Sequence, residues 1–76
     1  MNTTKRRARS LDVRGIRMGM KMSQPRFSTE FGIALSTLRQ WEQGTREPEG
    51  PACVLLAVIA HAPDAVRSAV SNLKAA

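Results

Sequence analysis

The chain has 76 residues, of which 42% are hydrophobic and 24% charged, with a formal net charge of +6. A chain of this length makes one domain with a modest core, and a partner subunit would help to stabilise it. No run reaches the roughly 20 apolar residues of a membrane span and no charged-then-apolar leader opens the chain, so we expect a cytoplasmic protein.

The first ten residues, MNTTKRRARS, show no apolar periodicity and carry four basic side chains, Lys5, Arg6, Arg7 and Arg9. This pattern predicts a disordered basic arm. The arm either remains a solvated tail or lies along the backbone or minor groove of DNA. The domain that follows is close to neutral, because residues 11–49 hold six basic and five acidic side chains.

A first helix is predicted after Asp12, which is a suitable N-cap residue. Val13, Ile16 and Met20 then follow at the i, i+3, i+7 spacing that places side chains on one buried face. A second helix is predicted at residues 24–31. The residues that mark its boundaries are Ser23 as N-cap, Pro25 in the first turn and Gly32 as a left-handed C-terminal residue.

The third predicted helix carries the polar side chains that point to function. Ala34, Leu38 and Trp41 are spaced as one buried face, and Gly44 follows as another left-handed residue. Two short helices joined by a glycine-containing turn form a helix-turn-helix, whose second helix enters the major groove of DNA. Glutamine suits adenine, arginine suits guanine, and small hydroxyl residues contact several base edges. The residues of these kinds outside the buried face are Ser36, Thr37, Arg39 and Gln40.

A fourth helix is predicted to begin at Pro51 and a fifth at Pro63. The fourth helix is apolar nearly all round, so it must be covered on more than one side. We expect Val54, Leu55 and Val58 to face the core. The remaining apolar positions are covered either by a second copy of the chain or within the monomer. The expected dimer contacts are Leu56, Ile59, Val66 and Val70.

Residues 11–76 are therefore expected to form one all-α domain, a compact five-helix bundle in which the last two helices dimerise. One cysteine, Cys53, and one histidine, His61, cannot supply the four ligands of a tetrahedral zinc site. The sequence also lacks paired carboxylates, a glycine-rich phosphate loop and a nucleophile with a candidate base. We expect no metal, no cofactor and no catalysis.

The run from Ile16 to Gly44, IRMGMKMSQPRFSTEFGIALSTLRQWEQG, resembles the Xre or Cro-type helix-turn-helix family of phage repressors and bacterial regulators. The matching pieces include MSQ at residues 22–24 and WEQG at residues 41–44. The segment EPEGPACVLLAVI that follows looks like the HigA-type antitoxin branch of that family. The resemblance implies a lambda-repressor-like fold and a place in the bacterial cytoplasm.

The resemblance also implies roles for single residues. Gln24 would contact a DNA phosphate at the positive end of the second helix. Arg17 and Glu42 match a paired arginine and glutamate that tie the first helix to the third, and Arg26 is either a phosphate contact or a solvated charge. The base-facing positions match Ser36, Thr37 and Gln40, with Arg39 beside them. The phosphate contacts after the recognition helix match Gln43, Gly44 and Arg46.

Two positions depart from the family pattern. Ala34 stands where the family usually has a capping serine or threonine. The missing cap costs the third predicted helix, which is the recognition helix of the helix-turn-helix, about 1 kcal/mol of stability. Lys21 stands where glycine or asparagine often closes the first helix. Neither departure changes the base-facing residues.

Together these features predict a sequence-specific transcriptional repressor that binds a palindromic operator in double-stranded DNA as a homodimer. The resemblance adds that it would be the autoregulating antitoxin of a HigBA-like toxin–antitoxin module, with a RelE-like toxin as partner. The alternative is a protein-interaction module whose main role is to neutralise such an mRNA-cleaving toxin. No membrane partner is expected.

Overall fold

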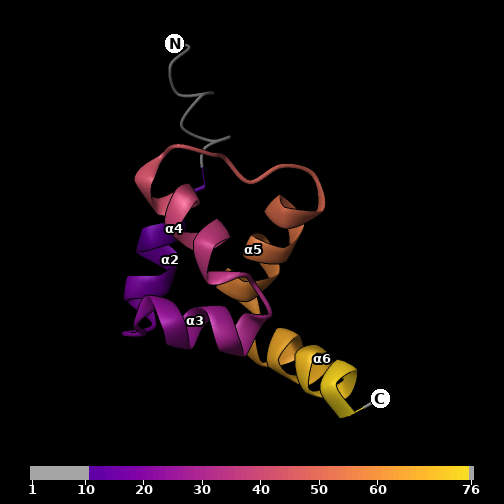
Figure 1. The fold of residues 1–76 in the computed structure, drawn as a ribbon. Helices are drawn as coiled ribbons and strands as arrows, with labels where there is room; N and C mark the ends of the chain where they lie inside the picture. Colours follow the sequence, from indigo (N-terminus) through magenta and orange to yellow (C-terminus); the bar gives the residue numbers. More distant parts are fainter. Residues whose placement is uncertain (1–10, 76) are drawn as a thin grey trace.

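The computed structural model describes residues 11–75, so Lys5, Arg6, Arg7 and Arg9 of the expected arm lie outside the described residues. Between residues 11 and 75 the chain forms five helices and no strand (Figure 1). They are α2 (Val13–Gly19), α3 (Gln24–Phe31), α4 (Leu35–Gln43), α5 (Pro51–His61) and α6 (Pro63–Ala75). The predicted all-α bundle of five helices is confirmed.

The first helices begin and end at the residues whose chemistry predicts a boundary. The carboxylate of Asp12 and the hydroxyl of Ser23 each accept a hydrogen bond from the backbone N–H three residues later, at 2.9 and 3.2 Å. Gly32 ends α3 and Gly44 ends α4, both in the left-handed region with φ of 68° and 83°. Glycine has no Cβ to strain there, so both glycines suit the turns that they make.

The two departures from the family pattern each have a structural counterpart. The N-terminus of α4 has no side-chain cap, because Ala34 carries no hydrogen-bonding group. Lys21 has φ of 58° and is the one non-glycine residue with a positive φ between residues 11 and 75. A left-handed conformation costs an L-residue about 1–2 kcal/mol, so the α2–α3 turn depends on the contacts around it.

One hydrophobic core joins all five helices. The rings of Phe27 and Phe31 on α3 lie at its centre, with centroids 4.8 Å apart and planes tilted by 59°. Trp41 of α4 packs against this core at its edge, as its place in the apolar stripe predicts. The buried core residues are Val13, Met22, Phe27, Phe31, Ile33, Leu38, Leu56, Ile59 and Val66.

The face of α5 that points inward differs from the prediction. Leu56 and Ile59 are completely buried in the core, whereas Val54 is 64% exposed and Val58 is 38% exposed. The prediction that Leu56 and Ile59 contact a partner, while Val54 and Val58 face the core, is therefore wrong. Because α5 is apolar nearly all round, no polar side marks its outer face and the sequence leaves its rotation undetermined.

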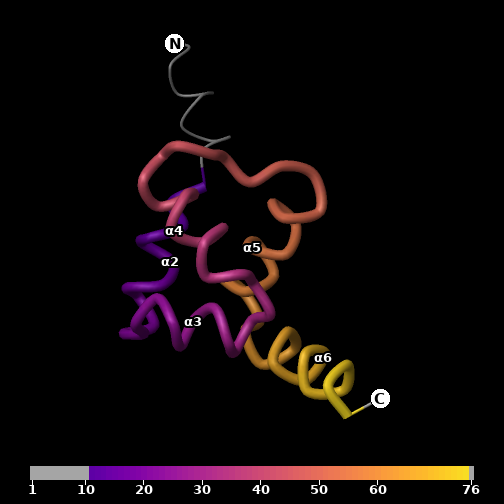
Figure 2. The backbone as a smooth tube through the Cα atoms, in the orientation of Figure 1, coloured from indigo at the N-terminus to yellow at the C-terminus, as the bar shows by residue number. Residues whose placement is uncertain are grey.

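α6 packs against α5 and α3 and then extends past α3 toward the C-terminus (Figures 1 and 2). Val66 of α6 is buried in the core at 6% exposure and Val70 is half-buried against it, and both line one apolar groove, so their assignment as dimer contacts stays a prediction. Leu73, one turn later, is 77% exposed. No single helix between residues 11 and 75 could span a membrane, although α5 and α6 together, bent by 120°, have the length and composition to do so.

Candidate nucleic-acid interface

The turn between α3 and α4 is held by Ser28. Its carbonyl accepts a hydrogen bond from the backbone N–H of Ile33 at 3.1 Å, and its hydroxyl donates to the carbonyl of the same residue. The side chain of Ile33 is buried in the core. These contacts fix the direction in which α4 leaves α3. The role of Ser28 could not be predicted from the sequence, since its spacing to Ile33 is meaningful only once the turn is formed.

α4 presents its polar side chains away from the core. Leu38 is completely buried and Trp41 is half-buried, so these two residues anchor the helix. The four residues predicted to face bases lie on the other faces of α4. Ser36 and Arg39 are exposed, and Thr37 and Gln40 are half-exposed. The structure therefore gathers all four on the accessible side of one helix.

The backbone after α4 folds over the end of the helix. The carbonyl of Gln40 accepts hydrogen bonds from the N–H groups of Gly44, Thr45 and Arg46, at 3.0, 3.1 and 3.3 Å. The three residues predicted to contact phosphates here, Gln43, Gly44 and Arg46, are all exposed. Arg46 shares a pocket of about 290 Å³ with Glu47 and Glu49. These carboxylates would repel a phosphate, so they limit the interface on that side.

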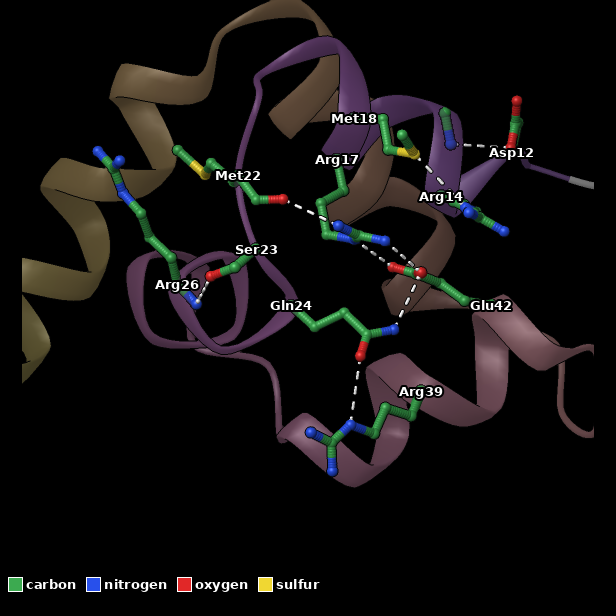
Figure 3. Close-up of polar contacts among 11 residues, drawn as sticks. Asp12, Arg14, Arg17, Met18, Met22, Ser23, Gln24, Arg26, Arg39 and Glu42 are labelled. Carbon is green, nitrogen blue, oxygen red and sulfur yellow. Dashed lines mark hydrogen bonds and ion pairs between the residues drawn. The ribbon is translucent and has the colours of Figure 1, made fainter.

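Arg17 and Glu42 form the ion pair that the family resemblance implies. The Nε of Arg17 lies 2.7 Å from Oε2 of Glu42 and its Nη2 lies 2.8 Å from Oε1, and the two side chains are 13% and 5% exposed (Figure 3). The Nη1 of Arg17 also donates to the carbonyl of Met22 at 2.9 Å. One guanidinium thus ties α2 and the α2–α3 turn to α4. The hydrogen bond from Arg17 holds the pKa of the Glu42 carboxyl below its usual value, against the opposing effect of burial.

Gln24, at the first position of α3, bridges α3 to α4. Its Nε2 donates to Oε1 of Glu42 at 3.1 Å, and its Oε1 accepts from Nε of Arg39 at 3.3 Å (Figure 3). Both polar atoms of this amide are therefore engaged within the protein. This bridge could not be predicted from local sequence patterns, because Arg39 lies 15 residues further along the chain. A direct phosphate contact by Gln24 stays a prediction.

Arg26 pairs with Glu30 on the same helix, at 2.9 Å, and its side chain is 62% exposed. Of the two interpretations of Arg26, this pairing favours a solvated charge over a dedicated phosphate contact.

Glu30 also accepts a hydrogen bond from Arg67 of α6 at 2.7 Å, and Arg67 pairs with Asp64 at the same distance. The guanidinium of Arg67 lies 5.2 Å from the ring centroid of Phe31, so α6 is fixed to α3 by charge and by packing. The hydrogen bonds from Arg67 and then Arg26 lower the pKa of Glu30.

Comparison of the chain with family models, curated proteins and solved structures finds no match. Only the residues of this chain therefore support the candidate interface. The structure brings Gln24 of α3 and Arg39 of α4 together, and it gathers the predicted base-facing residues on one side of α4.

Proposed function

We propose that this chain is a sequence-specific DNA-binding protein that represses transcription by binding a palindromic operator as a dimer. The observation that carries the proposal is the two-sided character of α4, which is anchored by buried Leu38 and presents unlike hydrogen-bonding groups on its other faces. A guanidinium, an amide and two hydroxyl groups match different base edges in the major groove. These groups belong to Arg39, Gln40, Ser36 and Thr37.

The charge of the chain supports a polyanionic partner. The sequence carries a net charge of +6, with 12 basic and six acidic residues. Four of the basic residues fall in the first ten positions, and the remaining eight exceed the six acidic residues by two. Arg39 forms no ion pair with any residue between 11 and 75, so its charge is available to DNA. Each phosphate that is neutralised steepens the slope of log binding constant against log salt concentration by about 0.9.

An apolar surface on α5 and α6 supports the dimer. A groove of about 470 Å³ lies between the end of α3 and these two helices, and Leu55, Val70 and Leu73 contribute to its walls. Leu73 on its wall is largely exposed, and an apolar groove of this kind marks an interaction site. Val54 and Val58 are also exposed on α5 but do not line the groove. We therefore propose Leu55, Val70 and Leu73 as the dimer contacts. A two-fold dimer would place its two recognition helices on half-sites about 34 Å apart, one helical turn of DNA.

A fluorescence-anisotropy titration with the DNA upstream of the protein's own gene tests the proposal. Wild-type protein should prefer this duplex to a scrambled one, with affinity falling steeply as salt rises. Gln40→Ala should weaken binding and relax the preference, whereas Asn72→Ala, an exposed amide on α6, should bind as the wild type does. If the wild type binds both duplexes equally, the proposal fails.

A second candidate function uses the same apolar surface for a different partner. In this reading the chain is an antitoxin whose groove on α5 and α6 holds a RelE-like, mRNA-cleaving toxin, and operator binding regulates both genes. The exposed side chain of Leu73 on the wall of this groove favours a protein partner. Co-expression with the adjacent gene distinguishes the candidates. If the chain forms a complex with the product of the adjacent gene, and Leu73→Asp disrupts that complex, the antitoxin function is supported. If the chain forms a stable homodimer that does not bind this product, the antitoxin function is contradicted.

A further inference from the structure

We propose that Gln24 is a positioning residue that sets Arg39 to recognise a guanine through its two terminal nitrogens, Nη1 and Nη2. This inference rests on the proposed DNA-binding function and deepens it. It replaces the direct phosphate contact as the main role of Gln24. Three hydrogen-bonded side chains, Glu42, Gln24 and Arg39, carry this inference (Figure 3).

Glu42 cannot turn. Both of its carboxylate oxygens accept hydrogen bonds from Arg17, and its side chain is almost completely buried. An ionised carboxylate only accepts hydrogen bonds, so the amide of Gln24 must face it with nitrogen and not with oxygen. The contact between Nε2 of Gln24 and Oε1 of Glu42, at 3.1 Å, has this polarity.

The fixed amide in turn determines what Arg39 can do. With its nitrogen on Glu42, Gln24 presents its oxygen to Nε of Arg39, at 3.3 Å. Nη1 and Nη2 of Arg39 point away from Gln24 and Glu42 (Figure 3). An arginine contacts O6 and N7 of guanine with two parallel N–H groups. Because Nε is occupied, the pair that remains for guanine is Nη1 and Nη2.

Holding Arg39 in advance also favours binding energetically. A long side chain that becomes ordered on binding loses rotamer freedom, and this loss weakens the complex. Arg39 is exposed and would otherwise sample many rotamers. The hydrogen bond to Gln24 restricts it before DNA arrives. Gln24 thus affects binding through Arg39, and the two residues should be energetically coupled.

A double-mutant cycle on operator binding measures this coupling. Gln24→Ala should weaken binding about tenfold when Arg39 is present and less than about twofold in the Arg39→Ala background. Gln24→Ala should also relax the preference at one guanine, which 7-deazaguanine substitution would identify in the wild type. Equal losses in both backgrounds would mean that Gln24 contacts DNA directly, and would overturn the proposal.

A measurement on the free protein separates this inference from the proposed function. In the wild type the Nε–H of Arg39 should give a protected ¹⁵N–¹H signal, which Gln24→Ala should abolish. Gln43→Ala, an exposed glutamine at the end of α4, should leave the signal unchanged. If the Arg39 signal is unchanged in Gln24→Ala, the positioning role of Gln24 is overturned. A wild type without duplex preference overturns the guanine assignment together with the proposed function, even if the signal behaves as expected.

Discussion

Arg17 on α2 and Glu42 on α4 form a two-point ion pair between residues that lie 25 positions apart in the sequence. The pair is nearly buried, and the same arginine also holds the carbonyl of Met22 in the α2–α3 turn. Glu42 further anchors Gln24 at the start of α3. This one contact therefore orients α4 relative to both preceding helices.

Loss of one partner should destabilise the fold. Arg17→Ala leaves the carboxylate of Glu42 buried without its counter-charge, and we expect the free energy of unfolding to fall by about 3 kcal/mol. Urea unfolding followed by circular dichroism measures this change. The control is Arg26→Ala, because Arg26 forms an exposed ion pair within one helix and should matter far less. Equal losses in the two variants would contradict the importance of the buried pair.

Stability should also depend on acid pH through the same glutamate. The hydrogen bond from Arg17 lowers the pKa of folded Glu42 below the ordinary value of 4.5. The carboxylate therefore contributes stability above that ordinary value, and the contribution disappears as pH falls through the lower, folded pKa. Glu30, whose pKa is also lowered by its arginine partners, adds to the same trend.

We expect the free energy of unfolding to decrease from about pH 5 downwards, and the decrease to be shallower in Glu42→Gln. Urea titrations at a series of pH values would check both statements. The part of the slope that remains in Glu42→Gln belongs to the other carboxylates, Glu30 among them. If the variant and the wild type lost stability in parallel, Glu42 would have no abnormal pKa.

The rotation of α5 can be tested with two matched truncations. Leu56→Ala removes a completely buried side chain and should cost about 2–5 kcal/mol. Val54→Ala removes an exposed one and should change the stability of the monomer by less than about 0.5 kcal/mol. Thermal unfolding at low protein concentration would measure both. A larger loss of stability in Val54→Ala than in Leu56→Ala would support the sequence-based prediction that Val54 faces the core.

The missing cap of α4 offers a stabilising change. Ala34 has the extended backbone of an N-cap residue, with φ of −60° and ψ of 135°, but no side-chain acceptor. Ala34→Ser should add about 1 kcal/mol, which raises Tm by about 4–8 °C in a domain of this size. Ala60→Ser, at an exposed position inside α5, serves as the control and should not raise it. An unchanged Tm in Ala34→Ser would show that the end of α4 is already satisfied.

The positions of the helices could be predicted because their boundaries depend on nearby residues. Ser23 caps α3 through the N–H three residues away, and Gly32 ends the same helix with a backbone angle that favours glycine. Such signals need no knowledge of the tertiary structure. The ion pair of Arg17 and Glu42 was predicted by family resemblance rather than by local chemistry.

The remaining features depend on contacts between distant segments. The rotation of α5 is set by what Leu56 and Ile59 touch, and its uniform apolar surface gave no indication of this. The bridge from Gln24 to Arg39 requires the α3–α4 turn to bring both side chains together. Ser28 and Glu30 acquire their roles in the same way, through Ile33 and Arg67.

The burial of Leu56 and Ile59 bears on how far the α3–α4 pair is portable. These two side chains of α5 complete the cluster around Phe27, Phe31 and Leu38. Grafted onto another scaffold without α5, the pair would expose both phenylalanine rings to water and lose the packing that sets the direction of α4. An engineer who wished to transfer the base-facing residues of α4 to another protein would have to transfer α5 as well.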